Sequence, residues 1–277
     1  MPEMPEVETI ARRLRKRIVG KSISHVRLSG FALRKPLDSG FADNLRGRTV
    51  RRIVRRGKYL VAALDPSAFW LIHLGMSGSI LYHARPEAGG KHAHVIVQFS
   101  DFTELEYRDP RRFGLMAVYD VPRLSLVPEI SALGRDPLNS GFNSSWLESQ
   151  LKKSRQEIKS FLLDQRKVAG LGNIYVCESL FLAQIHPQRR CYTITRGETA
   201  RLADAIREVL RNSIRRHGTS FSDFVDSDGN PGENQKHLMV FQRDGQECIR
   251  CRAPIGRFLQ GNRSTFYCFI CQRKEGD

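Results

Sequence analysis

The sequence lacks any apolar run that approaches the ~20 residues a helix needs to cross a bilayer. Its first residues are too acidic and too poor in apolar side chains to form a signal peptide. We therefore expect a cytoplasmic protein that has no membrane partner.

Cysteine is also scarce, with six among the 277 residues. A reducing cytoplasm disfavours disulfides, so these cysteines are expected to bind a metal or to remain free thiols. Acidic residues number 29 against 45 lysines and arginines, which leaves a net charge of +16. Because such a charge repels itself, it indicates a polyanionic partner, with nucleic acid as the first choice and an anionic membrane surface as the second.

At its start the chain reads Met1-Pro2-Glu3. Removal of the initiator methionine would leave Pro2 with a free secondary amine that can attack an aldehyde-level carbon, and the resulting iminium favours elimination at the neighbouring carbon. Glu3 could donate the matching proton. An acidic residue near a helix start also has an ordinary structural explanation. From Pro5 to Gly20 apolar residues recur at helical spacing, so a helix would anchor the amine.

Residues 22 to 120 contain short apolar or alternating runs bounded by turn residues. This pattern predicts a mostly β domain, folded as a sandwich or a flattened barrel. The predicted strands cover residues 24–28, 50–54, 59–64, 70–74, 94–99, 104–107 and 115–119.

Two loops of this domain each carry a residue that could have either a functional or a purely structural role. Lys58 follows Gly57 at a strand edge, where it could face the amine or belong to a solvated basic turn. Met76 lies on a glycine-flanked turn, where it could act as a wedge between bases or fill a gap under the turn.

A third loop carries Arg111 and Phe113, two residues apart. An extended segment would place both on one side, which suits phosphate contact together with base stacking. His92 and His94 could be polar donors nearby or ordinary surface residues.

Beyond the turn-rich stretch 133–145, which marks a domain boundary, the pattern is helical. The glycine-rich turn 167–173 feeds a helix N-terminus, where backbone N–H groups and Asn173 could hold a phosphate, or Asn173 could simply be the N-cap. Residues 217 to 237 are polar and rich in turn residues, so we expect a mobile loop that could close over a substrate. The predicted helices cover residues 146–153, 156–164, 173–184 and 195–216.

The most specific motif is two Cys-x-x-Cys pairs separated by sixteen residues near the C-terminus. This spacing is typical of a four-thiolate zinc site, which leaves no position for water and so predicts one structural zinc ion. Redox switching is the alternative. Between the pairs the sequence predicts a hairpin whose tip presents Arg263, whereas Cys177 and Cys191 fall outside the motif and are expected to be ordinary thiols. The predicted ligands are Cys248, Cys251, Cys268 and Cys271.

Four features now coincide: the Met-Pro-Glu start, the glycine–lysine turn, the glycine-rich helical turn that ends in asparagine, and the four-cysteine hairpin. Together they resemble the bacterial formamidopyrimidine-DNA glycosylases, base-excision repair enzymes of the helix-two-turn-helix family that also includes endonuclease VIII. The resemblance extends over nearly the whole chain. It is carried by residues 1–8, 57–60, 73–78, 109–114, 172–175, 178–181 and 248–272.

The resemblance implies a role for each matched position. Pro2 would attack C1′ of the damaged nucleoside, expel the base and form a Schiff base, while Glu3 would donate a proton to the sugar ring. Lys58 would assist β-elimination, and Arg263 would hold the flanking phosphates and support δ-elimination. Met76, Arg111 and Phe113 would fill the gap left by the flipped nucleotide, with Arg111 facing the orphaned base. The other DNA contacts would be His73, His92, Lys159 and Asn173.

The resemblance also implies an α+β fold in three parts. A leading helix and β-sandwich would form the N-terminal catalytic domain (1–132). A helix-two-turn-helix DNA-binding domain with a lesion-capping loop (133–237) and a four-cysteine zinc finger, folded as a zinc-ribbon hairpin (238–277), would follow. The expected partner is damaged double-stranded DNA, bound by a monomer associated with the nucleoid.

Two residues depart from the family's pattern. Glu233 stands where an aromatic residue is expected after Pro-Gly, which bears on the preference for 8-oxoguanine over other lesions. Arg252 stands where a glycine usually follows the second cysteine.

The predicted function is that of a bifunctional DNA glycosylase and AP lyase, which excises oxidised purines (8-oxoguanine and formamidopyrimidines) and cleaves the strand by β,δ-elimination. An endonuclease VIII-like enzyme for oxidised pyrimidines would share this chemistry, but the Met-Pro-Glu-Met-Pro-Glu start and the Asp-Pro-Arg-Arg-Phe loop argue against it. A non-catalytic zinc protein that binds damaged DNA would share the basic surface and the finger, but would not need a free Pro2.

Overall fold

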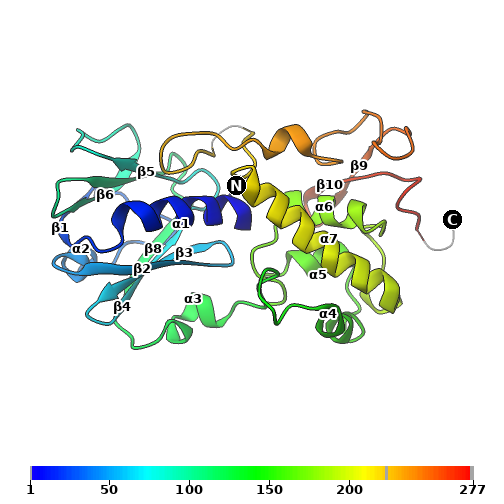
Figure 1. Cartoon of the computed structure of the whole chain (residues 1–277), viewed down its shortest axis with the longest axis horizontal. Coiled ribbons are helices and arrows are strands. Elements are labelled where there is room, and N and C mark those ends of the chain that lie inside the picture. Colours follow the sequence, from blue (N-terminus) through cyan, green and yellow to red (C-terminus); the bar gives the residue numbers. More distant parts are fainter. Residues whose placement is uncertain (1, 222–223, 275–277) are drawn as a thin grey trace. The chain divides into compact units, whose positions relative to one another are not determined.

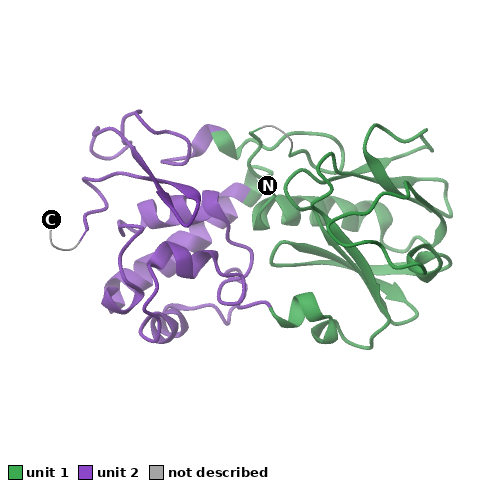
Figure 2. Cartoon of the chain, turned by 180° about the vertical axis from the view of Figure 1, so that it is seen from behind, with its two compact units in different colours: residues 1–132, 214–235 green, residues 133–213, 236–277 purple. Residues whose placement is uncertain are grey.

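The computed structural model of the chain (Figure 1) describes residues 2–221 and 224–274. Met1, on whose removal the predicted nucleophile depends, lies outside the described residues, as do residues 222 and 223 of the predicted mobile loop. Contacts divide the chain into two compact units (Figure 2): unit 1 comprises residues 1–132 and 214–235, and unit 2 comprises residues 133–213 and 236–277. The division into three domains at residues 132 and 237 stays a prediction.

Unit 1 begins with the predicted helix, α1 (Met4–Ile18). Pro5 lies in its first turn, where the missing N–H would have had no partner within the helix. The carboxylate of Glu6 accepts a hydrogen bond from the backbone N–H of Glu3 at 2.8 Å, which closes the helix start. Gly20, with φ of 90°, follows the last turn.

Two antiparallel sheets of four strands follow, in the orders β2-β3-β4-β8 and β1-β6-β7-β5. Each predicted strand has a counterpart, and β5 is an additional strand that the sequence pattern did not predict. The strands are β1 (Ile23–Leu28), β2 (Thr49–Arg56), β3 (Tyr59–Asp65), β4 (Ala68–His73), β5 (Ser79–His83), β6 (Ala93–Phe99), β7 (Glu104–Arg108) and β8 (Leu115–Tyr119). Three short helices, α2 (Phe41–Leu45), η1 (Leu124–Leu126) and α3 (Pro128–Ser131), complete this part of the unit.

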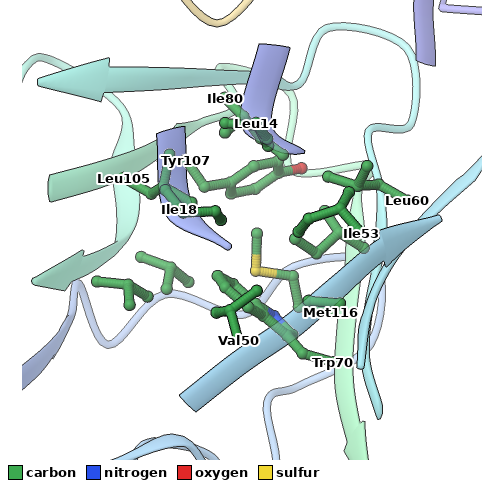
Figure 3. Close-up of a cluster of buried hydrophobic side chains, with 14 of the residues drawn as sticks. Leu14, Ile18, Val50, Ile53, Leu60, Trp70, Ile80, Leu105, Tyr107 and Met116 are labelled. Carbon is green, nitrogen blue, oxygen red and sulfur yellow. The ribbon is translucent and has the colours of Figure 1, made fainter. Parts of the chain in front are cut away.

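The core of unit 1 holds α1 against both sheets (Figure 3). Leu14 of α1 belongs to one buried cluster with Trp70 and Met116 of the first sheet and Ile80 and Tyr107 of the second. Burying a side chain such as Leu14 contributes about 1.5–3 kcal/mol. The stripe of apolar residues therefore fixes the helix whose first turn follows Pro2.

Unit 2 contains the four predicted helices and the predicted hairpin. Gly172, and not Asn173, is the N-cap of the third of these helices, so the alternative that made Asn173 the cap is wrong. Asn173 is the first helical residue, and its side chain is directed to the hairpin instead. The elements are α4 (Ser144–Leu151), α5 (Ile158–Leu163), α6 (Asn173–Leu182), η2 (Cys191–Thr193), α7 (Arg196–Arg215), whose last two residues belong to unit 1, β9 (Gly256–Gln260) and β10 (Arg263–Tyr267).

The predicted α+β class is confirmed, with its leading helix, antiparallel sheets, helical region and C-terminal hairpin. Within residues 2–221 and 224–274, no helix combines the length and the apolar character that a bilayer span requires.

Candidate active site, DNA-contact residues and metal centre

The four cysteines of the C-terminal motif lie close enough to share one metal ion. Their Sγ atoms all lie within 4.8 Å of one another, and the two closest recorded pairs are 3.4 Å and 3.9 Å apart. A tetrahedral ion with metal–sulfur bonds of about 2.3 Å would separate its sulfurs by about 3.8 Å. The cluster therefore fits one such ion, and zinc stays the predicted identity because every donor is a cysteine sulfur. The residues are Cys248, Cys251, Cys268 and Cys271.

Two predicted DNA contacts of unit 2 hold the hairpin that carries Arg263. The ammonium group of Lys159 donates to the carbonyl of Ser264 at 3.1 Å and to the hydroxyl of Thr265 at 2.7 Å, and the side-chain amide of Asn173 donates to the same carbonyl at 2.8 Å. Burial lowers the pKa of Lys159, and the charge of Arg263 adds to the decrease. Direct phosphate contact by Lys159 and Asn173 stays a prediction, since their recorded partners belong to the protein.

Arg263 itself is exposed at the start of β10. The two residues before it, Gly261 and Asn262, have φ of 55° and 59°, as a two-residue hairpin turn requires. Before the cysteine pairs in sequence, the buried carboxylate of Glu178 accepts three backbone N–H groups at 2.7 to 2.9 Å from residues 239–241. Helix α6 thus fixes the turn that leads into the first cysteine pair.

In unit 1, Pro2 and Glu3 are buried at the N-terminal end of α1. The Glu6 carboxylate that accepts the N–H of Glu3 also accepts the N–H of Thr219, at 2.8 Å through its other oxygen. One buried carboxylate therefore joins the backbone beside Pro2 to the start of the loop 217–237. No motif in the sequence indicates this pairing, because Glu6 and Thr219 are 213 positions apart.

The same helix holds the turn that carries Lys58. Glu8 of α1 binds the guanidinium of Arg55 at 3.2 Å, and Arg55 donates to the carbonyl of Gly57 at 3.1 Å. Burial would raise the pKa of Glu8, but the guanidinium groups of Arg12, Arg55 and Arg15 outweigh it and hold the pKa below its ordinary value. Gly57 has φ of 55°, which suits the first central position of a two-residue hairpin turn. Lys58 follows it with only 7% of its surface exposed.

His73, at the end of β4, lies near Lys58. Burial, together with the smaller effect of the positive charges of Lys58 and Arg34, lowers the pKa of His73 to about 4. Its Nδ1 accepts the N–H of Gly75 at 3.1 Å, which requires this nitrogen to be unprotonated. At neutral pH the side chain is therefore a neutral imidazole, whose other nitrogen carries the proton and can donate to an anion.

We expect His73 to make the free energy of unfolding depend on pH. Between about pH 4 and 6.5 the unfolded chain binds more protons than the folded one, because the imidazole pKa is near 6.5 when unfolded, so stability rises with pH over this window. At ~1.4 kcal/mol per pKa unit this difference corresponds to about 3 kcal/mol of the free energy of unfolding, which should be lost as the pH falls from 6.5 to 4. Urea denaturation should show a weaker pH dependence for His73→Gln than for wild type. The exposed His25→Gln should keep the wild-type slope, and an equal slope in all three would contradict the expectation.

Met76 and Phe113 are exposed on two loops that touch each other. A Cβ placed on Gly75 would lie 2.4 Å from the carbonyl carbon of Phe113, so only glycine permits this approach of the two backbones. The side chains of Met76 and Phe113 are 42% and 44% exposed, which excludes the interpretation of Met76 as a buried gap filler. The guanidinium of Arg111 lies over the Phe113 ring, 4.8 Å from its centroid. These residues form an exposed surface of apolar and cationic groups, as an intercalating wedge would need.

Asp109 organises this surface, although the sequence pattern gave it no role. Its buried carboxylate accepts hydrogen bonds from Ser77 at 2.7 Å, from Tyr107 at 3.0 Å and from the N–H of Gly114 at 2.8 Å. Its backbone N–H donates to the carbonyl of His92 at 3.0 Å. One aspartate, through its carboxylate and its backbone N–H, therefore connects the loops of Met76, Arg111 and His92. An aspartate that begins an Asp-Pro turn is the only local signal that could have indicated it.

The loop 217–237 is closed at its base. Gly218 has φ of 86°, and a Cβ on Gly232 would lie 2.2 Å from the Gly218 carbonyl oxygen. The N–H of Asn234 donates to the same carbonyl at 3.0 Å. Glu233, the departure from the family's pattern, is exposed beside this closure. Residues 218, 232 and 234 therefore meet at one point of unit 1, next to Glu6 of α1.

The second departure, Arg252, has φ of 65°, where a side chain is strained. Its ion pair with Glu247, at 3.1 Å, joins two side chains that are 81% and 68% exposed and so contributes little. We expect Arg252→Gly to increase the free energy of unfolding by about 0.5–1 kcal/mol, because the relief of strain exceeds the added entropy of the unfolded chain. Urea denaturation would measure it. Arg250→Gly, at a position without positive φ, should be destabilising, and a similar loss in Arg252→Gly would contradict the prediction.

The fold and these groups define a class of α+β protein with two units. In one unit Pro2 precedes a helix that packs against two antiparallel sheets, and in the other a helical region carries a hairpin with four clustered cysteines. Residues 1–116 match the model of the formamidopyrimidine-DNA glycosylase N-terminal domain, and residues 133–225 match that of the formamidopyrimidine-DNA glycosylase H2TH domain. The chain belongs to the formamidopyrimidine-DNA glycosylase family.

Named relatives and solved structures match nearly the whole chain. The formamidopyrimidine-DNA glycosylase of Teredinibacter turnerae is 43% identical over 98% of this chain and 100% of its own length, and that of Thioalkalivibrio sulfidiphilus is 40% identical over 99% and 100%. Among solved structures, a Lactococcus lactis Fpg mutant in complex with DNA that contains Fapy-dG has a TM-score of 0.90 and 33% identity, covering 99% of this chain and 100% of its own. The Fpg protein of Thermus thermophilus has a TM-score of 0.87 and 34% identity, covering 98% of each chain.

Proposed function

We propose that this chain is a bifunctional DNA glycosylase and AP lyase that excises oxidised purines from double-stranded DNA and then cleaves the strand. Membership of the family supports the general activity, that of a glycosylase that acts on damaged DNA. The solved Lactococcus lactis relatives, which were crystallised with DNA that contains Fapy-dG or an abasic site, support the class of substrate. The proposal adds two details to this general activity: the lyase step and the range of lesions.

One observation carries the proposal: the helix that Pro2 and Glu3 precede also holds the Lys58 turn. The buried stripe of α1 fixes the position of Pro2, and the Glu8–Arg55–Gly57 chain fixes the turn of Lys58 on the same helix. A nucleophile, an acid and a cation are thereby positioned by rigid elements of one unit, as covalent catalysis requires.

The chemistry then follows from the imino group. The nitrogen of Pro2 bonds to C1′ as the glycosidic bond breaks and the base leaves with a proton, and Glu3 gives a proton to the ring oxygen so that the sugar opens to an iminium. The iminium acidifies C2′, whose proton is removed as the bond from C3′ to its phosphate oxygen breaks. A second elimination breaks the bond from C5′ to its phosphate oxygen. Lys58 would assist the first elimination, and Arg263 would stabilise the departing phosphate.

The remaining predicted residues bind and distort the duplex in this proposal. Met76 and Phe113 would enter the stack when the damaged nucleotide is flipped out, and Arg111 would face the base left behind. His73 and His92 would donate to phosphates. A zinc ion held by the four cysteines would contribute to folding of the hairpin that presents Arg263, and would take no part in the reaction.

Borohydride reduction of a mixture with an abasic-site duplex tests the covalent step. A trapped protein–DNA adduct supports the enzyme, whereas intact binding without any adduct would support a non-catalytic damage-binding protein. Cleavage of parallel duplexes that carry 8-oxoguanine or thymine glycol tests the lesion range. Both lesions belong in the assay because a Lactococcus lactis relative was also solved with DNA that contains an oxidised pyrimidine.

A further inference from the structure

Unit 1 contains a pocket that no step of the proposed reaction uses. Its volume is about 550 Å³, and it lies between α1 and the residues around the end of α7. Since α1 rises 1.5 Å per residue, Arg13 lies roughly 15 Å along the axis from the start of the helix. The pocket is lined by Thr9, Arg12, Arg13, Lys16, Arg17, Ile214, Arg215, His217 and Asp228.

The lining is strongly cationic. Four of its residues occupy two successive turns of α1, where Arg12 lies four positions before Lys16 and Arg13 four positions before Arg17. Like charges at this spacing destabilise a helix by about 0.2–0.5 kcal/mol per pair. The negative end of the helix dipole favours cations only in the last turn, so it accounts for Lys16 and Arg17 and not for Arg12 and Arg13.

The carboxylates near these cations are each shared by several partners. Asp228, the only acidic residue among the described residues that line the pocket, pairs with Arg13 at 2.5 Å and with Arg17 at 3.4 Å. Glu8, the partner of Arg12, also pairs with Arg15 and Arg55. Positive charge therefore remains in excess at the pocket wall.

We propose that this pocket binds a phosphate-bearing anion. Guanidinium groups bind phosphate oxygens through paired hydrogen bonds, and three arginines of the lining come from α1. The volume lies within the range of about 300–1,000 Å³ that small-molecule sites occupy. Phe, Tyr and Trp are absent from the described residues that line it, and the one ring among those residues is the imidazole of His217, so we expect the phosphates and not a stacked base to be recognised.

The anion would compete with Asp228 for Arg13 and Arg17. Arg13 also binds the buried carboxylate of Asp226 at 2.7 Å, and that carboxylate accepts the N–H groups of Asp228 at 2.9 Å and Asn230 at 3.0 Å. The pocket is thus connected to the turn 226–230 of the loop that closes at Gly218. Removal of the competing charge at Asp228 should therefore strengthen binding of the anion.

Isothermal titration of the whole chain with inorganic tripolyphosphate at low salt tests the site. We expect Lys16→Gln/Arg17→Gln to weaken binding at least about tenfold. The matched control, Arg46→Gln/Arg51→Gln, removes the same charge from exposed positions of unit 1 outside the pocket and should weaken it less than about twofold. Equal weakening by the two double variants would show that the pocket is not the site and would overturn the proposal.

A second comparison tests the competition. Asp228→Asn should tighten tripolyphosphate binding about threefold or more, whereas Asp120→Asn, an exposed carboxylate outside the pocket, should change it little. Equal effects would also contradict the proposal. Duplex binding shows whether the phosphate comes from DNA or from a free ligand. If the pocket contacts DNA, Lys16→Gln/Arg17→Gln loses two contacts, and the magnitude of its slope of log K against log salt should be about 1.8 smaller than that of the control. An unchanged slope points to a free polyphosphate ligand.

Discussion

A peptide tag that remains attached in front of Pro2 should abolish covalent trapping on an abasic-site duplex. The tag converts the imino group of Pro2 into an amide, which has no lone pair available for attack on C1′. We expect the rates of base release and strand cleavage to fall by about 10³-fold or more, as is typical when a catalytic nucleophile is removed. Gel analysis after borohydride reduction, together with product release from an 8-oxoguanine duplex, would measure both effects.

The same tag at the C-terminus is the matched control and should leave trapping unchanged. Pro2→Gly keeps a free amine and should still form an adduct, with altered elimination, while its affinity for an uncleavable duplex stays near that of the wild type. Equal trapping by the N-terminally and C-terminally tagged proteins would exclude Pro2 as the nucleophile. Mass spectrometry of the active protein gives an independent test, because retained methionine would contradict the mechanism.

The sequence predicted the regular elements because their patterns are local. The apolar spacing of α1 and the alternation of the central strands repeat within a few residues, so a short window contains the whole signal. Strand β5 was missed because it is an edge strand with a single buried residue, Ile80, which leaves no alternation to detect. Helix α2 has five residues, too few to show a period.

The chemistry of the candidate site was predictable only where a motif is contiguous. The two Cys-x-x-Cys pairs and the proline at position 2 are short motifs that the sequence shows directly, and the four cysteines of the pairs do lie in one cluster. The groups that position them come from distant parts of the chain: Glu8 and Arg55 are 47 positions apart, and Glu178 and Met239 are 61 apart. No local pattern records such a pairing, because only the fold brings the two partners together.

The Lys159 contact shows a further limit. The resemblance implies a phosphate contact for this lysine, whereas its ammonium group is buried and donates to Ser264 and Thr265. An ammonium group has three protons, so the two recorded bonds leave one for a phosphate. The resemblance therefore selected Lys159 as a DNA contact, but could not show that it also supports the strand that begins with Arg263.

Cys268→Ser should remove the metal and open the hairpin. Cys268 and Cys248 are fully buried in a small cluster with Ile255 and Phe266, so the metal site and the hairpin's core are one structure. A two-stranded sheet is marginally stable alone, and structural zinc contributes about 10–16 kcal/mol of apparent binding energy in zinc-finger peptides. We expect metal content to fall from about one ion per chain to nearly none, and duplex affinity to fall at least about tenfold as Arg263 loses its position. Elemental analysis and duplex titration would measure these losses.

Cys191→Ala is the control, because Cys191 is also buried in unit 2 but lies outside the metal cluster. Burial raises the pKa of Cys191 to about 11, so it remains a neutral thiol at the pH at which the cluster binds metal. This variant should keep its metal and its affinity for the duplex. Protease cleavage between residues 256 and 267 should appear in Cys268→Ser and not in Cys191→Ala. If Cys268→Ser stayed protected and bound DNA normally without metal, the hydrogen bonds of Lys159, Asn173 and Gln260 and the buried cluster would suffice to hold the hairpin, and zinc would have no structural role.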